Sequence, residues 1–386
     1  MKSAKSLKIL HLAPDEKFID MGLRAFKKVA PHSNQLLVIS DTPVLKYIES
    51  EVDKIFSESE LDSEKFSNYI YQFDVVVLHS LCRVNIPFPK HVKTLWIGFG
   101  MDYYDLISDN FDDLLLPKTR QLNSLSQSKI FKLKRALKKI PAVEKVHRKL
   151  HGQKTKSEYL QRIDYFAPVL ESEYEMVASK DAKFKPKFAD WNYGTLEDDL
   201  VKDLPDLMSD AQYILLGNSA TITNNHVDAF ELLEQLDLKD RKIICPLSYG
   251  DEDYRNKVLN RGKDIFGANF LPITKFMSVD NYLSTLSSCS VVIMNHLRQQ
   301  ALGNIITMLY RGATVFLNKQ NPVYDFFKEQ GAVLYAIDEL EADNSLINYR
   351  LTPKEVELNK SILLQHWSRQ AINNKTEQLI NKLMSN

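Results

Sequence analysis

Short apolar runs alternate along the chain with longer segments in which apolar residues recur every three or four positions. The short runs predict buried strands, and the longer segments predict amphipathic helices. We expect strands at residues 7–13, 35–40, 74–79, 94–98, 165–168, 212–216, 242–245, 270–273, 291–294 and 313–317. Strands that alternate with helices in this way are typical of parallel sheets with crossover helices, so the predicted fold class is α/β.

The hydrophobic pattern also divides the chain into two predicted domains. It weakens between Lys183 and Pro205, where proline, aspartate and glycine gather. A chain of 386 residues suits two domains of ordinary size, and we place the linker in this stretch. The predicted domains span residues 1–190 and 206–352, and a helical segment at 353–386 could cross back to the first domain.

Polar residues follow the predicted strands of the second half at the point where each strand ends. Ligands of open α/β sheets bind at the carboxyl ends of strands, and helix N-termini there favour anions. The candidate residues are Gly217, Asn218, Ser219, Tyr249, Arg298, Gln299, Gln300, Gly303, Asn318 and Asn321. Together they predict a site for a phosphorylated ligand, although each loop by itself also fits an ordinary turn.

The turn after the strand at 291–294 carries the most distinctive chemistry. Arg298 provides a permanent positive charge that can pair with a diphosphate at two points, and Gln299 and Gln300 add amide groups. Gly303 lies at the start of the following helix, where it costs stability relative to alanine. A ligand that comes close to the helix would explain this glycine. The alternative is a surface turn with an ion pair.

The first half offers weaker candidates. Asp102 follows a predicted strand in a loop rich in glycine and aromatic residues. A carboxylate there could act as a general base on an acceptor hydroxyl, and an aspartate that bonds its own turn is an equally good interpretation. His79 also ends a strand and could bind an acceptor, although a histidine satisfied at the edge of the core is the more common arrangement.

Composition narrows the function classes. With 44% hydrophobic and 26% charged residues, the chain can bury sizeable cores. No apolar run approaches the roughly 20 residues of a membrane span, and the N-terminus lacks the apolar core of a signal peptide. Cys82, Cys245 and Cys289 are far apart and are interpreted as buried thiols of a cytoplasmic protein. Because the sequence has no metal-ligand motif, G-x-G-x-x-G or Walker A motif, we expect metal-independent chemistry without a cofactor.

The formal net charge of zero conceals a strongly basic segment at residues 118–156. It contains 13 lysine or arginine residues and one acid, Glu144, so that 37 basic and 49 acidic residues remain elsewhere. Its apolar residues recur at three- and four-residue steps, with a break near Pro141, and predict a basic amphipathic helix. Such a helix can lie on an anionic membrane surface; the alternative is a solvated helix packed on its own domain. Nucleic acid is a poorer partner, because no aromatic stacking motif accompanies the charge.

Several blocks of the sequence resemble a known family. Residues 217–226 are similar to its G-N-S-x-x-x-x-N-x-H block, and residues 298–303 and 317–322 are similar to its next two blocks. A fainter block at 96–104 parallels W-G-x-D-x-Y. The family is that of the TDP-N-acetylfucosamine:lipid II N-acetylfucosaminyltransferases, the 4-acetamido-4,6-dideoxygalactose transferases.

The resemblance implies a GT-B glycosyltransferase in which two Rossmann-like domains with parallel sheets face a central cleft. The second domain would bind a dTDP or UDP sugar, such as dTDP-N-acetylfucosamine. The first would bind a polyprenyl-diphosphate-linked acceptor. Our candidates for acceptor binding are His79 and Tyr103, and our candidate for the catalytic residue is Asp102. The basic segment at 118–156 would then hold the protein peripherally on the inner face of the cell membrane.

Two other functions remain open on the same fold. A non-catalytic protein would bind nucleotide sugars without turnover. A nucleotide-sugar epimerase would act without an acceptor and would usually need paired carboxylates and a histidine.

Overall fold

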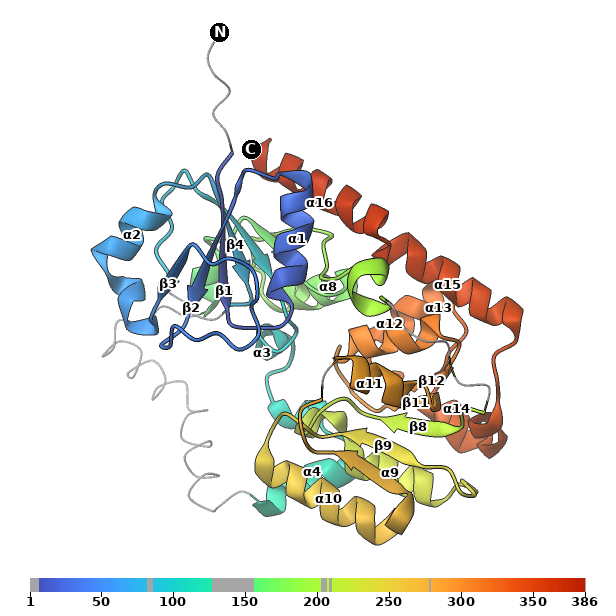
Figure 1. Ribbon diagram of the computed structural model, residues 1–386. Helices are drawn as coiled ribbons and strands as arrows, with labels where there is room; N and C mark the ends of the chain where they lie inside the picture. The colour runs from blue at the N-terminus through green and yellow to red at the C-terminus, as the bar shows by residue number, and fades with distance from the viewer. Residues whose placement is uncertain are drawn as a thin grey trace. The chain divides into compact units, whose positions relative to one another are not determined.

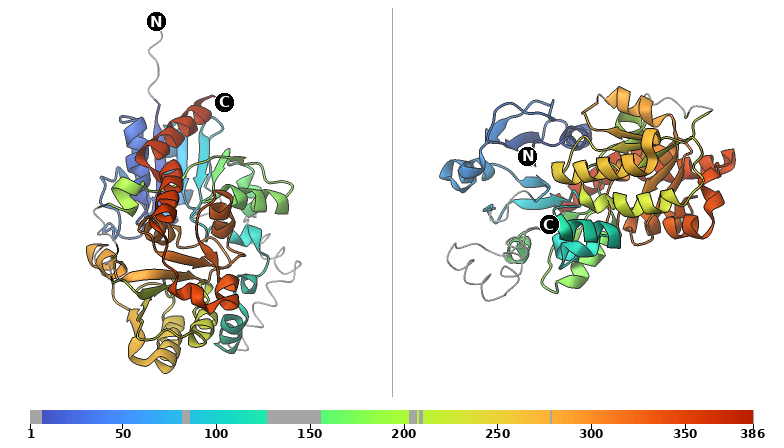
Figure 2. Two further views of the ribbon diagram at one scale, coloured as in Figure 1. Left: turned by 90° about the vertical axis from the view of Figure 1, so that its right-hand side faces the viewer. Right: turned by 90° about the horizontal axis from the view of Figure 1, so that it is seen from below.

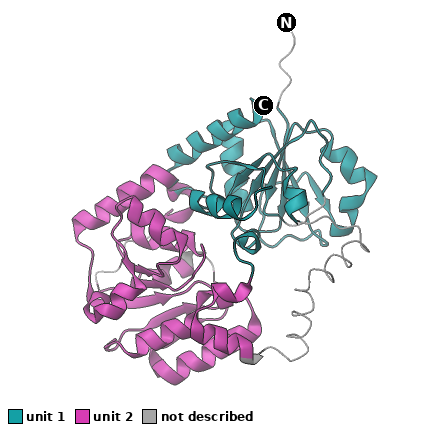
Figure 3. Cartoon of the chain, turned by 180° about the vertical axis from the view of Figure 1, so that it is seen from behind, with its two compact units in different colours: residues 1–109, 129–195, 367–386 teal, residues 110–128, 196–366 magenta. Residues whose placement is uncertain are grey.

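The computed structural model describes residues 7–81, 86–126, 156–202, 207, 210–277 and 279–385. The chain forms two compact units (Figure 3). Unit 1 comprises residues 1–109, 129–195 and 367–386, and unit 2 comprises residues 110–128 and 196–366. Residues 110–128 precede the predicted linker but belong to unit 2, because the helix that they contain packs on a helix of that unit.

Unit 1 is built around a sheet whose described strands are all parallel. Across the sheet, they are β3 (Lys54–Phe56), β2 (Asn34–Ile39), β1 (Ile9–Pro14), β4 (Val75–His79), β5 (Lys93–Ile97), β6 (Tyr165–Ala167) and β7 (Lys187–Phe188). The helices are α1 (Ile19–Val29), α2 (Glu64–Ile70), α3 (Tyr104–Ile107), α7 (Lys156–Leu160), α8 (Glu171–Lys180) and α16 (Arg369–Met384). The chain runs outward from β1 to β3 and then returns to add β4 on the other side of β1.

Unit 2 repeats this plan with a second parallel sheet. Its described strands, in order across the sheet, are β10 (Phe270–Ile273), β9 (Ile243–Pro246), β8 (Tyr213–Leu216), β11 (Cys289–Met294), β12 (Thr314–Leu317) and β13 (Tyr335–Ala336). Its helices are α4 (Pro117–Ser126), α9 (His226–Glu234), α10 (Glu252–Phe266), α11 (Val279–Leu286), α12 (Leu302–Tyr310), α13 (Pro322–Glu329), α14 (Ile337–Ala342) and α15 (Pro353–Trp367). Here the chain adds β9 and β10 on one side of β8 and then returns to add β11 on the other side of β8.

The two parallel sheets confirm the predicted α/β class. Each predicted strand corresponds to an observed one, and the described strands that the pattern missed are β3, β7 and β13. These three are two or three residues long and lie at sheet edges. A run that short carries too few positions to show a periodicity, so only the sheet to which it adds reveals it.

Helices cover the faces of both sheets. In unit 1, α16 runs along α1 (Figure 1). In unit 2, α9 and α10 lie side by side on one face with α4 next to α9, and α11 and α12 lie on the other face (Figures 1 and 2). This layering buries both faces of the central strands, which is why those strands read as continuous apolar runs.

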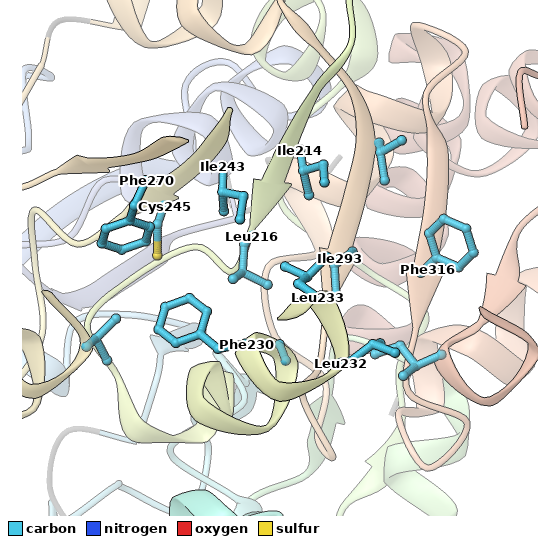
Figure 4. Packing of buried hydrophobic residues seen from close by; sticks show 14 of the residues in the cluster. Ile214, Leu216, Phe230, Leu232, Leu233, Ile243, Cys245, Phe270, Ile293 and Phe316 are labelled. Carbon is cyan, nitrogen blue, oxygen red and sulfur yellow. The ribbon is translucent and has the colours of Figure 1, made fainter. Parts of the chain in front are cut away.

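The core of unit 2 lies between its sheet and α9 (Figure 4). Phe230 and Leu233 of α9 pack against Leu216 and Ile293 of the central strands, and all four are buried. The ring of Phe230 also meets that of Phe270 edge-on, with centroids 5.6 Å apart. Each such side chain contributes about 1.5–3 kcal/mol through burial, so this layer fixes the strands whose carboxyl ends carry the polar loops.

The C-terminal helical segment is two helices rather than one. Ser368 is extended (φ −62°, ψ 154°) and its side chain caps α16 by accepting a hydrogen bond from Ala371 N at 3.2 Å. α15 belongs to unit 2, apart from its last residue, and α16 belongs to unit 1. In unit 1, Trp191 Nε1 donates to Thr376 Oγ1 of α16 at 2.9 Å, so the end of the chain completes the first unit.

Most of the predicted basic helix, residues 127–155, lies outside the described residues. Both ends of the basic segment pair with acids of their own unit. Lys118 Nζ lies 3.0 Å from Glu231 in unit 2, and Lys156 bonds Asp105 in unit 1. Among the described residues, no helix combines the length and the apolar character that crossing a membrane requires. Of the cysteines, Cys245 and Cys289 are buried free thiols.

Candidate functional site

The predicted site residues of the second half lie where the chain of unit 2 reverses direction. β8 and β11 are neighbours in the sheet, but the chain leaves β8 toward β9 and comes back only at β11. Ligands of open α/β sheets bind at the carboxyl ends of the two strands that flank such a switch point. The loop after β8, residues 217–225, and the loop after β11, residues 295–301, are therefore the walls of the candidate site.

The loop after β8 is shaped by two residues with positive φ, Gly217 (+65°) and Asn225 (+52°). Between them, Asn224 is fully buried and closes the loop on itself. Its Oδ1 accepts from Asn218 N at 2.9 Å, and its Nδ2 donates to Thr221 O at 2.9 Å. Side-chain bonds thus replace water for backbone groups that the tight turn leaves without partners.

Two buried histidines lie beneath this loop. His296 Nε2 is 2.9 Å from Asn224 Oδ1, and because that oxygen can only accept, His296 carries its proton on Nε2. Burial holds the pKa of His296 well below its ordinary value, and the nearby charge of Arg298 lowers it further. His226 Nδ1 lies 3.1 Å from Tyr254 Oη, and burial lowers the pKa of His226 to about 3. Both histidines are neutral at physiological pH, and their hydrogen bonds support the loop.

Several predicted donor-binding side chains bond one another across loops. Gln300 Nε2 donates to Asn218 Oδ1 at 2.9 Å, and Gln300 Oε1 accepts from Thr223 Oγ1 at 2.7 Å. Asn218 Nδ2 in turn donates to Tyr249 Oη, 3.1 Å away, after β9. The structure therefore brings these predicted residues together. The side chains of Gln300 and Asn218 form hydrogen bonds that join the loops after three strands.

The backbone joins the loops after β8 and β9 as well. Ala220 N donates to Tyr249 O at 2.8 Å, and Asp251 N donates to Ala220 O at 3.0 Å. Gly250 makes this approach possible, because a Cβ at that position would lie 2.5 Å from the carbonyl carbon of Ala220. Ser219 is buried in the same turn, where its Oγ donates to Thr221 Oγ1 and accepts from Asn224.

Arg298 and the start of α12 form the part of the site that suits an anion. The Arg298 side chain is 5% exposed, and its Nη1 donates to Gln299 O at 2.9 Å. Ala301 (φ +61°) is the N-cap residue of α12, and its side chain makes no capping hydrogen bond. Gly303 in the first turn is exposed, and a Cβ there would meet only Leu200, at 3.6 Å. Among the described residues, no neighbouring atom therefore requires a glycine at this position.

The loop after β12 holds the remaining predicted residues in structural roles. Asn318 Nδ2 donates to Asn295 Oδ1 at 3.1 Å, and Asn318 Oδ1 accepts from Gln320 N. Asn321 caps α13 by accepting from Val323 N at 3.1 Å. Both asparagines stabilise the edge of the site, so direct contact of either with a donor stays a prediction.

Unit 1 has its own switch point, between β1 and β4, and a chain of hydrogen bonds runs through it. His11 Nε2 is 3.0 Å from Asn34 Oδ1, and His11 Nδ1 is 2.8 Å from His79 Nε2. His79 Nδ1 is 2.6 Å from Tyr193 Oη. Because Asn34 Nδ2 donates to Ala30 O, its Oδ1 must accept from His11. It follows that His79 donates to His11, and Tyr193 donates to His79.

The candidates of the first half lie deeper than expected. His79 is fully buried with both nitrogens bonded, so it cannot itself touch an acceptor in this structure. Tyr103 is also fully buried, and its hydroxyl donates to Glu173 at 2.8 Å. Asp102 accepts from Leu81 N, Trp96 Nε1 and Phe99 N at 2.7–2.9 Å. Of these three donors, Phe99 N lies in the same loop as Asp102, as the interpretation of a structural turn residue expects, and a catalytic role for Asp102 stays a prediction.

The site candidates chosen from the sequence did not include the buried polar residues that support the loops, or Asn34, which is partly buried. The buried ones are Thr223, Asn225, Asn295, His11 and His296. The one available signal was a polar residue inside or directly after an apolar run, as in Ile9–Pro14. Among the described residues, no three histidine, cysteine, aspartate or glutamate side chains gather as metal ligands would.

Part of unit 2 matches a known protein family. Residues 196–356 match the family model described as 4-alpha-L-fucosyltransferase, glycosyl transferase group 56. This stretch contains the strand-end loops of unit 2 and agrees with the resemblance predicted from the blocks at 217–226, 298–303 and 317–322.

Solved structures share the fold over nearly the whole chain. Sucrose-phosphate synthase from Thermosynechococcus elongatus is 9% identical with a TM-score of 0.61, over 98% of this chain and 99% of that one. HepE of Anabaena, in complex with UDP and glucose, is 10% identical with a TM-score of 0.62, over 98% of this chain and 100% of that one. A glycosyltransferase from Rickettsia africae is 12% identical with a TM-score of 0.60, over 99% and 100% of the two chains.

At such identities the likeness establishes the fold alone, and it confirms the predicted GT-B class of two parallel α/β domains. The activity rests on the family match to residues 196–356, in the unit that carries Arg298 and the loops of the candidate site. With that fold and that match, the chain is a glycosyltransferase of the GT-B fold whose residues 196–356 match glycosyl transferase group 56.

Proposed function

We propose that this glycosyltransferase moves a deoxyamino sugar or a related hexose from dTDP or UDP to a polyprenyl-diphosphate-linked glycan. The observation that carries the donor half is the position of Arg298, buried just before the start of α12, whose N-cap residue is an alanine, at the switch point of unit 2. The family match over residues 196–356 and the UDP in the similar HepE structure support a nucleotide-sugar donor.

In this proposal the diphosphate of the donor lies against α12. The guanidinium of Arg298 pairs with phosphate oxygens, and the N-terminal N–H groups of α12 add partial positive charge. Gly303 lets the diphosphate approach the helix, which accounts for a glycine that no neighbour among the described residues requires. The same groups stabilise the negative charge that develops on the leaving nucleoside diphosphate, so the transfer proceeds without a metal ion.

The hydrogen bonds among Gln300, Asn218 and Tyr249 give the site its rigidity. They tie together loops that follow three different strands, so the groups that contact the donor are held in place before it binds. Preorganisation of this kind raises affinity because fewer rotatable groups must be ordered upon binding. Tyr249, which is 47% exposed and oriented by Asn218, is placed to contact the nucleoside or the sugar.

The acceptor half of the proposal rests on the sequence. A polyprenyl-linked glycan is a membrane substrate, and a peripheral position on the inner face of the cell membrane would bring the enzyme to it. The basic segment at residues 118–156 supplies the positive charge for binding to anionic lipid. Unit 1, with its own switch point, is then the unit that binds the glycan.

Isothermal titration calorimetry with UDP and dTDP tests the donor site. We expect Arg298→Ala to lower the affinity about ten- to a hundredfold, because a charge-assisted bond of roughly 1.5–3 kcal/mol is lost. Arg298→Lys should recover only part of it, since a lysine cannot form the two-point contact. Arg255→Ala is the matched control, because Arg255 lies on α10 of the same unit and pairs with Glu252. If wild-type protein binds neither nucleotide at millimolar concentration, the donor assignment is wrong.

Turnover distinguishes the proposal from a non-catalytic binding protein and from an epimerase. The transferase should release nucleoside diphosphate from a dTDP or UDP sugar when a farnesyl diphosphate-linked disaccharide of N-acetylhexosamines is present. Binding without release would favour the non-catalytic protein. Conversion of the nucleotide sugar to its epimer without an acceptor would favour the epimerase.

Flotation with liposomes that contain anionic phospholipid tests the membrane half. The protein should float with the liposomes at low salt and stay at the bottom of the gradient at high salt, because salt screens the attraction between basic residues and lipid. Failure to float at low salt would remove the membrane from the proposal and leave the donor site untouched.

A further inference from the structure

Three aromatic side chains of unit 1 meet at the edge of its sheet where the strands end. Phe18 follows β1, Phe99 follows β5, and Tyr193 lies in the segment after β7. The ring centroid of Phe18 is 6.0 Å from that of Phe99 and 6.0 Å from that of Tyr193, and the latter two are 5.4 Å apart. All three side chains are at least partly exposed. We call these three rings the aromatic surface.

The aromatic surface lies at the switch point of unit 1. β1 and β4 are neighbours in the sheet, and the chain leaves β1 toward β2 and β3 before it returns to β4. Phe18 is in the loop after β1, and Tyr193 reaches the end of β4, because its Oη is 2.6 Å from His79 Nδ1. Ligands of open α/β sheets bind at this edge, so the surface is placed to meet a ligand of unit 1.

Phe18 occupies a position where helix stability favours a different kind of residue. It is the N-cap of α1, where serine, threonine, aspartate and asparagine are preferred because their side chains accept a hydrogen bond from the first turn. The Phe18 side chain makes no such bond, and the residue is 42% exposed. A phenyl group at this position therefore costs stability relative to a polar cap. A ligand that covers the ring would account for it.

Hydrogen bonds and close packing hold the Tyr193 ring in place. Its hydroxyl donates to His79, which in turn donates to His11. A Cβ at Gly22 of α1 would lie 2.9 Å from Tyr193 Cε1, so a glycine lets the ring pack against the helix. The buried ring of Trp191 also meets the Tyr193 ring edge-on, with centroids 5.0 Å apart. A ring that is already fixed loses little conformational entropy when a ligand covers it.

Two carboxylates hold the loop that carries Phe18. Asp15 accepts from the backbone N–H groups of residues 46–48, and Asp20 accepts from those of residues 49 and 50. These bonds tie the loop after β1 and the start of α1 to a segment that follows β2. The position of Phe18 beside the other two rings is thus fixed by the fold of unit 1 and does not depend on a ligand.

The chemistry of the three loops suits an uncharged sugar ring. Residues 15–18, 98–103 and 189–195 carry the rings and contain four acids and one base, Lys17. The charge of these loops opposes a diphosphate or an anionic lipid headgroup. A pyranose ring has C–H groups that pack on the negative face of an aromatic ring, and its hydroxyls can donate to carboxylate and carbonyl oxygens.

We propose that the aromatic surface binds a sugar ring of the acceptor glycan by stacking. This inference rests on the proposed function, in which unit 1 binds the glycan. The stacked ring is one that lies away from the diphosphate, because the charge of the loops opposes that group. Phe18, Phe99 and Tyr193 are then residues that determine specificity, since they favour an acceptor with an apolar C–H face at this position.

Saturation-transfer difference NMR with the full chain tests the proposal. The ligand is the farnesyl diphosphate-linked disaccharide of N-acetylhexosamines, and farnesyl diphosphate alone is the comparison. We expect the strongest saturation on C–H protons of one sugar ring. Phe18→Ala should reduce this saturation and raise the dissociation constant of the linked disaccharide roughly three- to tenfold. Phe18→Leu should weaken binding similarly, because leucine is apolar but has no aromatic face, whereas Phe18→Tyr should bind as the wild type does.

Tyr71→Ala is the matched control. Tyr71 is an aromatic residue of unit 1 that is 65% exposed, and it lies between α2 and the start of β4, at the opposite edge of the sheet. This variant should bind the linked disaccharide as the wild type does. In steady-state kinetics, Phe18→Ala should raise KM for the acceptor and leave kcat unchanged, because stacking is equally strong before and during the transfer. Its affinity for UDP should not change, since the proposed nucleotide site is in unit 2.

Three results would overturn the inference. The first is wild-type affinity for the linked disaccharide in Phe18→Ala or in Phe18→Leu. The second is saturation of the prenyl methyl protons that Phe18→Ala removes, because the surface would then bind the lipid. The third is a wild-type protein that binds UDP or dTDP but not the linked disaccharide, which would also overturn the acceptor half of the proposed function. The first two results would leave the proposed function intact.

Discussion

His296 donates its Nε2 proton to Oδ1 of Asn224 over 2.9 Å and so joins the loops after β11 and β8. The same oxygen accepts from Asn218 N, also at 2.9 Å. Neither histidine nor asparagine is exposed to solvent, so the bond is exchanged for water only if the loops separate. Hydrogen bonds therefore join the two walls of the proposed donor site. The stability of this arrangement should depend on the space that is left next to Oδ1 of Asn224.

Gly217→Ala tests that space. A Cβ at Gly217 would lie 2.7 Å from Asn224 Oδ1 and 2.8 Å from His226 Nε2. The substitution must displace one of these buried groups and also places alanine at a φ of +65°. The positive φ costs about 1–2 kcal/mol, and a buried polar group without a partner costs about 1–3 kcal/mol more. We expect both losses in urea unfolding followed by far-UV circular dichroism.

Gly331→Ala is the control for that experiment. Gly331 also has a positive φ, +81°, but a Cβ there would meet no atom within 4 Å. The free energy of unfolding of Gly331→Ala should therefore fall only by the part that comes from the backbone conformation. Tryptophan fluorescence would not report on unit 2, which contains both glycines, because the tryptophans Trp96, Trp191 and Trp367 all belong to unit 1. Equal losses for Gly217→Ala and Gly331→Ala would contradict the account of the polar layer beneath the loop.

Gly303→Ala should separate stability from ligand binding. Within the described part of the chain nothing blocks a Cβ at Gly303, and alanine favours a helix by up to about 1 kcal/mol over glycine, so the variant should unfold at a slightly higher temperature. If the donor diphosphate lies against α12, the added methyl group should nevertheless weaken the binding of UDP or dTDP. A stabilised variant with unchanged nucleotide affinity would place the diphosphate elsewhere.

The buried histidines predict a dependence of stability on pH. The pKa of His11 is lowered to about 4 and that of His226 to about 3, while those of His79 and His296 lie well below the ordinary value. Below pH ~6.5 the unfolded chain binds protons at these positions and the folded chain does not. The free energy of unfolding should therefore fall with decreasing pH, by on the order of 1 kcal/mol per histidine between pH 7.5 and 5.5. Urea unfolding at the two pH values measures it, and equal free energies would mean that the histidines are not buried as described.

At the switch points, the positions of some site residues could be predicted from the sequence, whereas their contacts could not. Arg298 and the glycines at 217 and 303 could be chosen from the sequence because their positions follow directly from the strands before them. The burial of Tyr103 and the three bonds of Asp102 could not, because their partners, Glu173 and the backbone of Leu81 among them, are distant in sequence. A residue type shows what chemistry is possible, whereas only its neighbours in space show whether that chemistry is already used.

The sequence by itself determined the alternation of strands and helices, the two α/β domains and the strand ends at which ligands bind, because periodicity and turn residues are local properties of the chain. The tertiary structure alone decided the order of the strands, and with it the switch points between β8 and β11 and between β1 and β4. It also decided which polar side chains hold loops together and which remain for a substrate. The carboxylate of Asp102 shows the reason, because it accepts hydrogen bonds from Leu81 N and Trp96 Nε1, whose approach depends on the fold and not on the local sequence.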